Sequence, residues 1–158
     1  MHNLPTQRRR PLSRWLQLVL LSLLLVGMPL PAAELVAGKP VPRAVEKTVR
    51  AVVEAQLEAF ANDDAQRAFS LATPEIRRHF GSAERFLLMV RVGYPVVHRP
   101  RSVVYLRPEG VRNLVMLPVQ MTDDDGRQWL ATYTLQQQKD KAWRIAACTV
   151  VEDERLST

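Results

Sequence analysis

The side chains of this sequence that could do acid–base chemistry are two adjacent aspartates, two histidines beyond the first few residues, and three tyrosines. They are Asp63, Asp64, His79, His98, Tyr94, Tyr105 and Tyr133. An isomerase, dehydratase or hydrolase built on a cavity needs a carboxylate or a histidine within hydrogen-bond reach of a tyrosine. The sequence contains the residue types that such an enzyme needs. Whether they form a catalytic site depends on whether the fold brings them together.

The local sequence gives the two aspartates a structural role. Asp63 and Asp64 lie between two helix-like segments, where a side-chain oxygen can cap the start of the second helix. A hard cation needs several more ligands than these two carboxylates supply. His79 and His98 have neither a companion cysteine nor the two-histidine spacing of a zinc site. We therefore expect no metal, no cofactor and no catalytic residue among these side chains.

Two further features also have structural interpretations. Residues 123–126 (Asp-Asp-Asp-Gly) lack the length and the distal glutamate of a calcium loop, so we expect a hairpin turn. Cys148 is the only cysteine, which excludes an internal disulfide. Its apolar neighbours in the sequence predict a buried and unreactive thiol.

The first 33 residues have the features of a secretory signal. They contain four arginines and no acidic residue, then an apolar run from Trp15 to Val26, then small residues at Ala32 and Ala33. The run is shorter than the ~20 residues that a membrane-spanning helix needs. We predict a signal peptide over residues 1–33 and a periplasmic or secreted protein. An uncleaved membrane anchor is the alternative, because Pro31 replaces the small residue preferred three positions before the cut.

The positive charge of the chain belongs largely to this leader. The whole sequence has 22 Lys and Arg against 16 Asp and Glu, and without residues 1–33 the basic count falls to 18. The remaining charges alternate in sign, as in residues 75–78 and 151–155. Because no stripe of positive charge stands out, we expect no nucleic-acid partner.

Residues 44–94 have the pattern of consecutive helices. After an extended lead-in over residues 34–43, apolar residues recur every three or four positions from Val45 to Phe60. A short helix is expected through residues 65–71. Thr73 followed by Pro74, and then Ser82 after Gly81, are typical starts of two further helical pieces. The last piece ends before Tyr94.

From residue 96 onward the apolar period changes to two, which predicts strands. We expect them at residues 103–106, 114–121, 128–136 and 143–151, with turns at 108–110 and 123–126. Pro118 inside the second strand implies an edge position or a bulge. The last strand is expected to place alternate side chains on one face, namely Trp143, Ile145, Ala147, Thr149 and Val151.

Helices followed by strands predict an α+β fold in which N-terminal helices pack on a curved antiparallel sheet of about four strands. The expected boundaries are a single domain over residues 44–153 and a tail over residues 154–158. Neighbouring strands in the sequence are expected to be neighbours in the sheet. A curved sheet covered by helices commonly leaves a conical cavity.

The ordered motifs of residues 56–60, 63–64, 68–72, 74–76, 80–82, 86, 89–90 and 94–96 resemble domain of unknown function 4864, a family of small, mostly bacterial proteins. The resemblance covers residues 45–152. The arrangement is similar to the cone-shaped, cystatin-like fold of nuclear transport factor 2, ketosteroid isomerase and the polyketide cyclases. The family has no established catalytic residues, so the resemblance implies none here. An isomerase of this fold typically takes a tyrosine from the first helix, and residues 45–60 contain no tyrosine.

The first functional hypothesis is an exported domain, not an enzyme, that holds a small apolar or amphipathic ligand in its cone. A second is an interaction module that forms a homodimer through its sheet face, anchored by Trp129, Tyr133 and Trp143. An isomerase or dehydratase using the same cavity is the enzymatic alternative, and membrane contact is expected only through an uncleaved leader. The aromatic candidates for the pocket or the interface are Phe60, Phe69, Phe86, Tyr94, Tyr105, Trp129, Tyr133 and Trp143.

Overall fold

The computed structural model describes residues 38–153, so the predicted signal peptide and the tail over residues 154–158 lie outside the described residues. In this part of the chain the helices are α1 (Arg43–Ala61), α2 (Ala65–Ser70), α3 (Pro74–Phe80), α4 (Ala83–Gly93) and α5 (Pro95–His98). The strands are β1 (Lys39–Pro40), β2 (Ser102–Tyr105), β3 (Glu109–Val111), β4 (Leu114–Thr122), β5 (Gln128–Gln137) and β6 (Trp143–Glu152).

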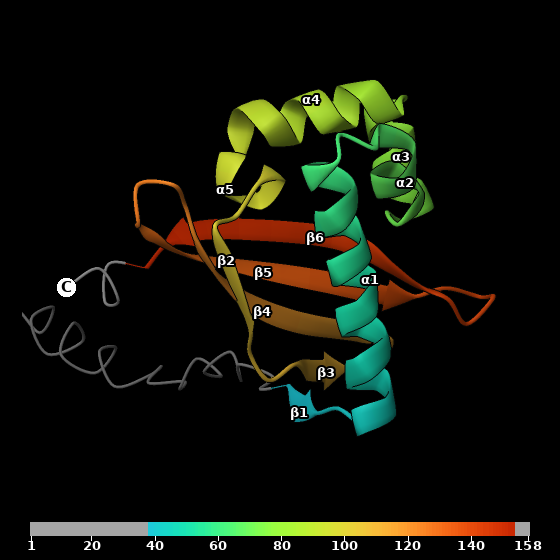
Figure 1. Cartoon of the computed structure of the whole chain (residues 1–158). Coiled ribbons are helices and arrows are strands. Elements are labelled where there is room, and N and C mark those ends of the chain that lie inside the picture. Colours follow the sequence, from blue (N-terminus) through green and yellow to red (C-terminus); the bar gives the residue numbers. More distant parts are fainter. Residues whose placement is uncertain (1–37, 154–158) are drawn as a thin grey trace, which may run out of the picture. The chain divides into compact units, whose positions relative to one another are not determined.

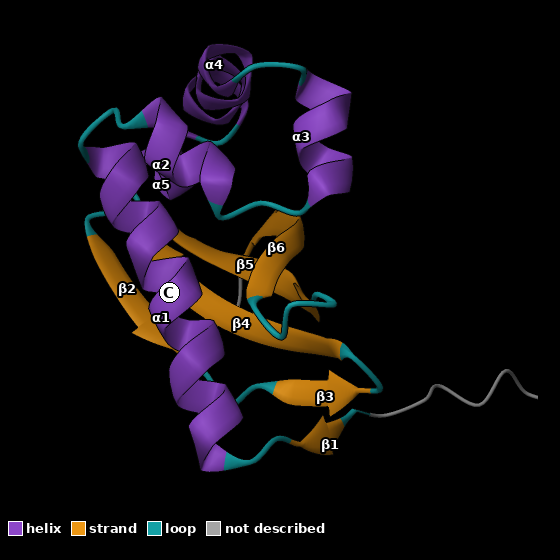
Figure 2. Ribbon diagram, turned by 90° about the vertical axis from the view of Figure 1, so that its right-hand side faces the viewer, coloured by secondary structure: helices purple, strands orange, loops and turns teal. Residues whose placement is uncertain are grey.

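The helices lie together over one face of the antiparallel sheet, and α1 crosses that face (Figures 1 and 2). The core is formed between these two layers by the inward side chains of β4 and β5 and the apolar stripe of α1. The predicted α+β class, with helices packed on a curved antiparallel sheet, is confirmed. Within residues 38–153, no helix has the length and apolar character needed to cross a membrane.

The helix starts are fixed by the local chemistry that the sequence predicted. The Asp64 carboxylate accepts a hydrogen bond from the backbone N–H of Arg67 at 3.0 Å, which caps α2. Thr73 and Ser82 cap α3 and α4 in the same way. Gly81 ends α3 with a φ of 72°, a left-handed conformation that glycine adopts without a steric penalty.

The short helix α5 was not predicted, because the alternating pattern was expected to begin at Val96. Pro95 occupies the first turn, where its missing N–H costs no hydrogen bond. Val96, Val97 and His98 are consecutive and all buried, which an alternating surface strand would not allow. Burial of these three side chains therefore overrides the strand preference of the two valines.

The sheet has the order β1-β3-β4-β5-β6, and β2 pairs with β4 beside β3. The predicted turn at residues 108–110 is partly wrong, because Glu109 begins β3 and pairs with Met116. β2 and β3 thus share one side of β4, with a break between them. Neighbouring strands are antiparallel throughout the described sheet, as expected.

Pro118 lies at this break and not at the edge of the sheet. Its carbonyl oxygen accepts a hydrogen bond from the Leu106 N–H at 2.9 Å, on the side of β2 and β3. The N and the C=O of a strand residue point to the same side, so the missing N–H of the proline also faces the break. An interior strand therefore tolerates this proline without losing a bond to β5.

The expectation that alternate residues of β6 share one face along its whole length is wrong. Leu135 pairs with Ile145 whereas Thr134 pairs with Ala147, so β6 has one extra residue at this point. Trp143 and Ile145 face the core before the irregularity, and Cys148 and Val150 pack against it afterwards. Val151, predicted to share the face of Trp143, is 53% exposed.

Candidate functional site

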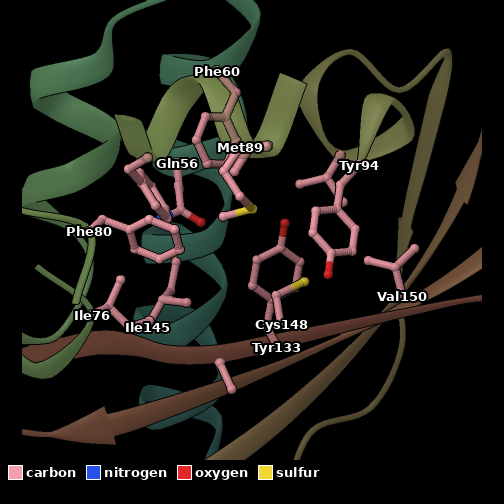
Figure 3. Close-up of a pocket in the computed structure, with 14 residues that line it drawn as sticks. Gln56, Phe60, Ile76, Phe80, Met89, Tyr94, Tyr133, Ile145, Cys148 and Val150 are labelled. Carbon is pink, nitrogen blue, oxygen red and sulfur yellow. The ribbon is translucent and has the colours of Figure 1, made fainter. Parts of the chain in front are cut away.

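A cavity of about 290 Å³ lies between the helices and the last two strands (Figure 3). Its walls come from α1, α3, α4, α5, the residue that joins α4 to α5, β5 and β6. The lining residues are Gln56, Phe60, Ile76, Phe80, Phe86, Met89, Val90, Tyr94, Val97, Tyr133, Ile145, Ala147, Cys148 and Val150. The walls are therefore mostly apolar.

One end of the cavity is a cluster of phenylalanines centred on Phe86. The ring centroid of Phe86 lies 5.3 Å from that of Phe80, 5.6 Å from that of Phe69 and 5.8 Å from that of Phe60. Tilted and edge-on contacts at these distances are favourable for aromatic rings. The cluster joins three helices to α1 and gives the cavity a well-defined wall.

The Tyr133 hydroxyl is the least expected group in the cavity. The residue is completely buried, and its hydroxyl points from the sheet toward the helices (Figure 3). The hydroxyl has no hydrogen-bond partner of normal geometry. The Cys148 thiol is close enough for a weak hydrogen bond with it, because a thiol is a poor hydrogen-bonding group. Burial raises the pKa of Tyr133 well above its ordinary value, so the hydroxyl remains a donor.

Two other polar groups reach the cavity. The Gln56 side chain is buried, and its Nε2 donates a hydrogen bond to the Ala68 carbonyl at 3.1 Å, which holds the amide in place. Burial raises the pKa of Cys148 to about 12, so its thiol stays protonated at neutral pH.

The lining residues include no carboxylate, histidine, lysine or arginine. The thiol and the buried phenol are both held in their neutral forms. Proton abstraction requires a group that is a base near the working pH, and these walls do not provide one. The arrangement can hold an uncharged molecule by apolar contact and by a small number of hydrogen bonds.

The structure brings four of the eight aromatic candidates to this cavity: Phe60, Phe86, Tyr94 and Tyr133. Phe69 packs against Phe86 and does not line the cavity. Tyr94 lies at the rim, with 40% of its surface exposed.

The other three candidates lie elsewhere. Tyr105 packs beneath the Arg50 guanidinium, 4.4 Å from its ring centroid. The Trp129 indole N–H donates to Asp123 Oδ2 at 2.9 Å, beside a separate surface groove. Trp143 is buried in the core. Trp143 and Tyr133 are thus both on the helix-covered side of the sheet, away from its open face.

The cavity also contains residues that were not predicted for it, of which Gln56 is the most informative. Gln56 lies three residues after Val53 and four before Phe60, within the apolar stripe of α1. A polar residue in such a stripe is a detectable indication of a buried polar contact. Ile76, Phe80 and Met89 resemble ordinary core residues in the sequence, so nothing distinguished them.

A charged cluster outside the cavity lining ties the end of α1 to α5. Asp63 Oδ1 lies 2.9 Å from His98 Nε2, and Asp63 Oδ2 accepts a hydrogen bond from Arg99 at 2.7 Å. Arg91 lies 3.9 Å from the same carboxylate. The hydrogen bond with His98 and the charge of Arg99 lower the pKa of Asp63. The predicted capping role therefore holds for Asp64, whereas Asp63 binds the following helices.

These elements define a small α+β domain with a mostly apolar cavity between its helices and its sheet. Within that class, the chain belongs to the family described as Domain of unknown function (DUF4864), which matches residues 42–158. The family resemblance drawn from residues 45–152 of the sequence is thereby confirmed.

The solved structures that are similar to the chain include the following three. An NTF-2 like protein of unknown function from Silicibacter pomeroyi DSS-3 has a TM-score of 0.49 and 16% identity, covering 72% of this chain and 100% of that one. A proposed dehydratase of the NTF2-like family from Streptomyces avermitilis has a TM-score of 0.49 and 11% identity, covering 72% and 99%. An NTF-2 like protein of unknown function from Burkholderia xenovorans LB400 has a TM-score of 0.43 and 15% identity, covering 68% and 84%. Comparison with curated proteins finds no match.

The unpaired hydroxyl leads to a prediction about stability. We expect Tyr133→Phe to raise the free energy of unfolding of the ligand-free protein by about 1 kcal/mol, because it removes an unsatisfied buried group and keeps the ring. Urea unfolding with an unchanged m-value measures this difference. Tyr105→Phe, which removes a hydroxyl outside the cavity, is the matched control. A loss of stability in Tyr133→Phe would mean that the hydroxyl has a partner.

The Asp63 cluster predicts a pH dependence of stability. The folded pKa of Asp63 is lowered, so its contribution is present above the unfolded pKa of about 3.9 and is lost as the pH falls through the lower folded value. We expect Asp63→Asn to be less stable than wild type at neutral pH, with a difference that shrinks as the pH falls below about 4. Chemical denaturation across this pH range tests it. Asp64→Asn, which keeps a capping oxygen and removes a neighbouring carboxylate outside the cluster, is the matched control.

Proposed function

We propose that this domain binds a small, uncharged, mostly apolar ligand in the cavity, and that the Tyr133 hydroxyl donates a hydrogen bond to an acceptor oxygen of that ligand. The observation that carries the proposal is the buried hydroxyl, which has no hydrogen-bond partner of normal geometry and lies beside a weakly hydrogen-bonding thiol. Buried polar groups in folded proteins are nearly always paired, and an orphan at the wall of an apolar cavity is an attachment point for a ligand.

The dimensions and the charge of the cavity support a particular class of ligand. A cavity of about 150 Å³ holds benzene, so 290 Å³ suits a molecule of about two rings or its aliphatic equivalent. Burying an ionised ligand without a countercharge is costly, and no lining residue supplies one. A neutral ketone, ester, ether or alcohol fits these requirements.

Binding without catalysis is favoured over an isomerase or dehydratase. Those reactions need a base in contact with the substrate, and neither Asp63 nor His98 lines the cavity. We also propose that the ligand is met outside the cytoplasm. This location is supported by the features of residues 1–33 in the sequence.

The experiment compares two probes of similar shape, 2-acetylnaphthalene and 2-ethylnaphthalene, by isothermal titration calorimetry. The first has a carbonyl acceptor and the second does not. We expect wild type to bind the ketone about two- to tenfold more tightly, the range that one neutral hydrogen bond provides. In Tyr133→Phe the two affinities should become equal, whereas Tyr105→Phe should keep the wild-type ratio.

The two parts of the proposal, ligand binding in the cavity and hydrogen bonding by Tyr133, can be refuted separately. If neither probe binds, the cavity is not a ligand site for molecules of this class. If both bind to wild type with equal affinity, the cavity is a ligand site but Tyr133 is not the donor.

The open face of the sheet favours a second role, the pairing of two copies of the chain. Its outward side chains on β4 and β5 are uncharged, and Val104, Leu114, Met116 and Val151 are exposed there. The outward side chains of β5 are mostly Gln and Thr, so the face combines exposed aliphatic residues with uncharged polar ones, a composition that an interaction surface can have.

The sheet-face hypothesis predicts a dimer that a single charge disrupts. We expect Met116→Lys to convert the dimer to a folded monomer, because an unpaired charge would be buried at the interface. Light scattering after size exclusion measures the mass, and circular dichroism confirms the fold. Leu88→Lys, which changes an exposed aliphatic residue on the helical side, should leave the dimer intact. A wild-type monomer at high concentration would refute the hypothesis.

A further inference from the structure

Helix α4 exposes aliphatic side chains on the side opposite to its buried face. Phe86 and Val90 point into the core, whereas Leu88 is 53% exposed and Val92 is 74% exposed. Residues four apart lie on one side of a helix, so Leu88 and Val92 form a continuous apolar stripe. Both side chains face solvent.

Arginines accompany this stripe. Arg85 lies three residues before Leu88 on the same side, and it has no ion pair among the described residues. Arg91 lies near the end of α4 and Arg99 follows α5, and the two share a single carboxylate, that of Asp63. The helical region over residues 62–101 contains seven arginines and four acidic residues. Arg85 and Arg91 therefore place positive charge beside the stripe, whereas the turn over residues 123–125 brings three aspartates to the groove beside Gly93 and Tyr94.

The stripe is on the outermost helix and near the cavity. α4 lies on the side of the helical layer away from the sheet in both views (Figures 1 and 2). Tyr94, which follows α4 directly, is partly exposed and lines the cavity. The exposed face of α4 and the rim of the cavity are therefore adjacent.

We propose that the α4 face, formed by Arg85, Leu88, Arg91, Val92 and Tyr94, docks on the surface of an anionic lipid bilayer. Aliphatic and aromatic side chains enter the interfacial layer while arginines contact lipid phosphates, which is the combination that interfacial helices use. A single narrow helix face is convex and small compared with the ~800 Å² that a stable protein partner covers. A bilayer accepts such a face without needing a complementary groove.

Docking in this orientation would turn the rim at Tyr94 toward the lipid, where apolar molecules concentrate. The surface itself does not depend on the cavity holding a ligand, since Arg85, Leu88 and Val92 do not line it. Membrane docking and ligand binding can therefore be tested independently, one with vesicles alone and the other without vesicles.

The experiment places an environment-sensitive fluorophore, NBD, at Val92→Cys and, in a second protein, at Val104→Cys on the open sheet face. Both positions are accessible to the label, because Val92 is 74% exposed and Val104 is 54% exposed. Cys148 is left in place, since burial raises its thiol pKa to about 12, and wild type carried through the same labelling is the blank. Both labelled proteins keep residues 1–37, so any contribution of that segment to vesicle binding is the same in both.

We expect vesicles of phosphatidylcholine and phosphatidylglycerol (3:1) to shift the emission of the label at position 92 to the blue and to leave position 104 unchanged. High salt should reverse the shift. Arg85→Gln should weaken vesicle binding about fivefold, the contribution of one arginine near an anionic surface. Arg107→Gln, the same change in the connection between β2 and β3, should have no such effect.

Three results would overturn the proposal. They are no shift at position 92, an equal shift at both positions, and an equal response to vesicles of phosphatidylcholine alone. The first would leave an acidic protein as the partner of this face, and the third would show that the arginines do not recognise anionic lipid.

Discussion

The extra residue in β6 determines what the cavity is made of. Before the irregularity, Trp143 and Ile145 face the helices, and after it the alternation is shifted so that Cys148 and Val150 do. Without the insertion, a strict alternation would turn Thr149 and Val151 toward the helices. A bulge also bends the strand that contains it. One residue thus sets both the composition and the curvature of the cavity floor.

The Gln56 amide and the Tyr133 hydroxyl are polar groups in a core that is otherwise mostly apolar. The Gln56 amide is held by the Ala68 carbonyl, whereas the Tyr133 hydroxyl is the one buried side-chain polar atom without a partner among the described residues. A phenylalanine would fill the same space without that cost. Natural proteins keep an unfavourable local feature mainly where function compensates for it, so the tyrosine supports the proposal of a ligand in the cavity.

The sequence alone was sufficient to predict the features that depend on residues close together in the chain. Caps such as Asp64 and Ser82, the apolar stripe of α1 and the four main strands all follow from chemistry within one turn or one pleat. Features set by distant residues were missed. The strand β3 needs its partner in β4, and the Asp63–His98 contact joins positions 35 residues apart. The cavity was anticipated from the fold, but only half of the aromatic candidates line it, because the packing of the helices on the sheet decides which of the inward side chains reach the cavity.

The walls of the cavity are not anchored equally. The rim at α5 is fastened by the Asp63 cluster and by three consecutive buried residues. In contrast, α3 has no fully buried residue, although Ile76 and Phe80 line the cavity. Its start is held by backbone hydrogen bonds between residues 71–73 and Ile145 of β6, and its end is held through the contact of Phe80 with Phe86. Because local opening costs least where the least apolar surface is buried, α3 is the wall whose displacement would admit a ligand at the lowest free energy.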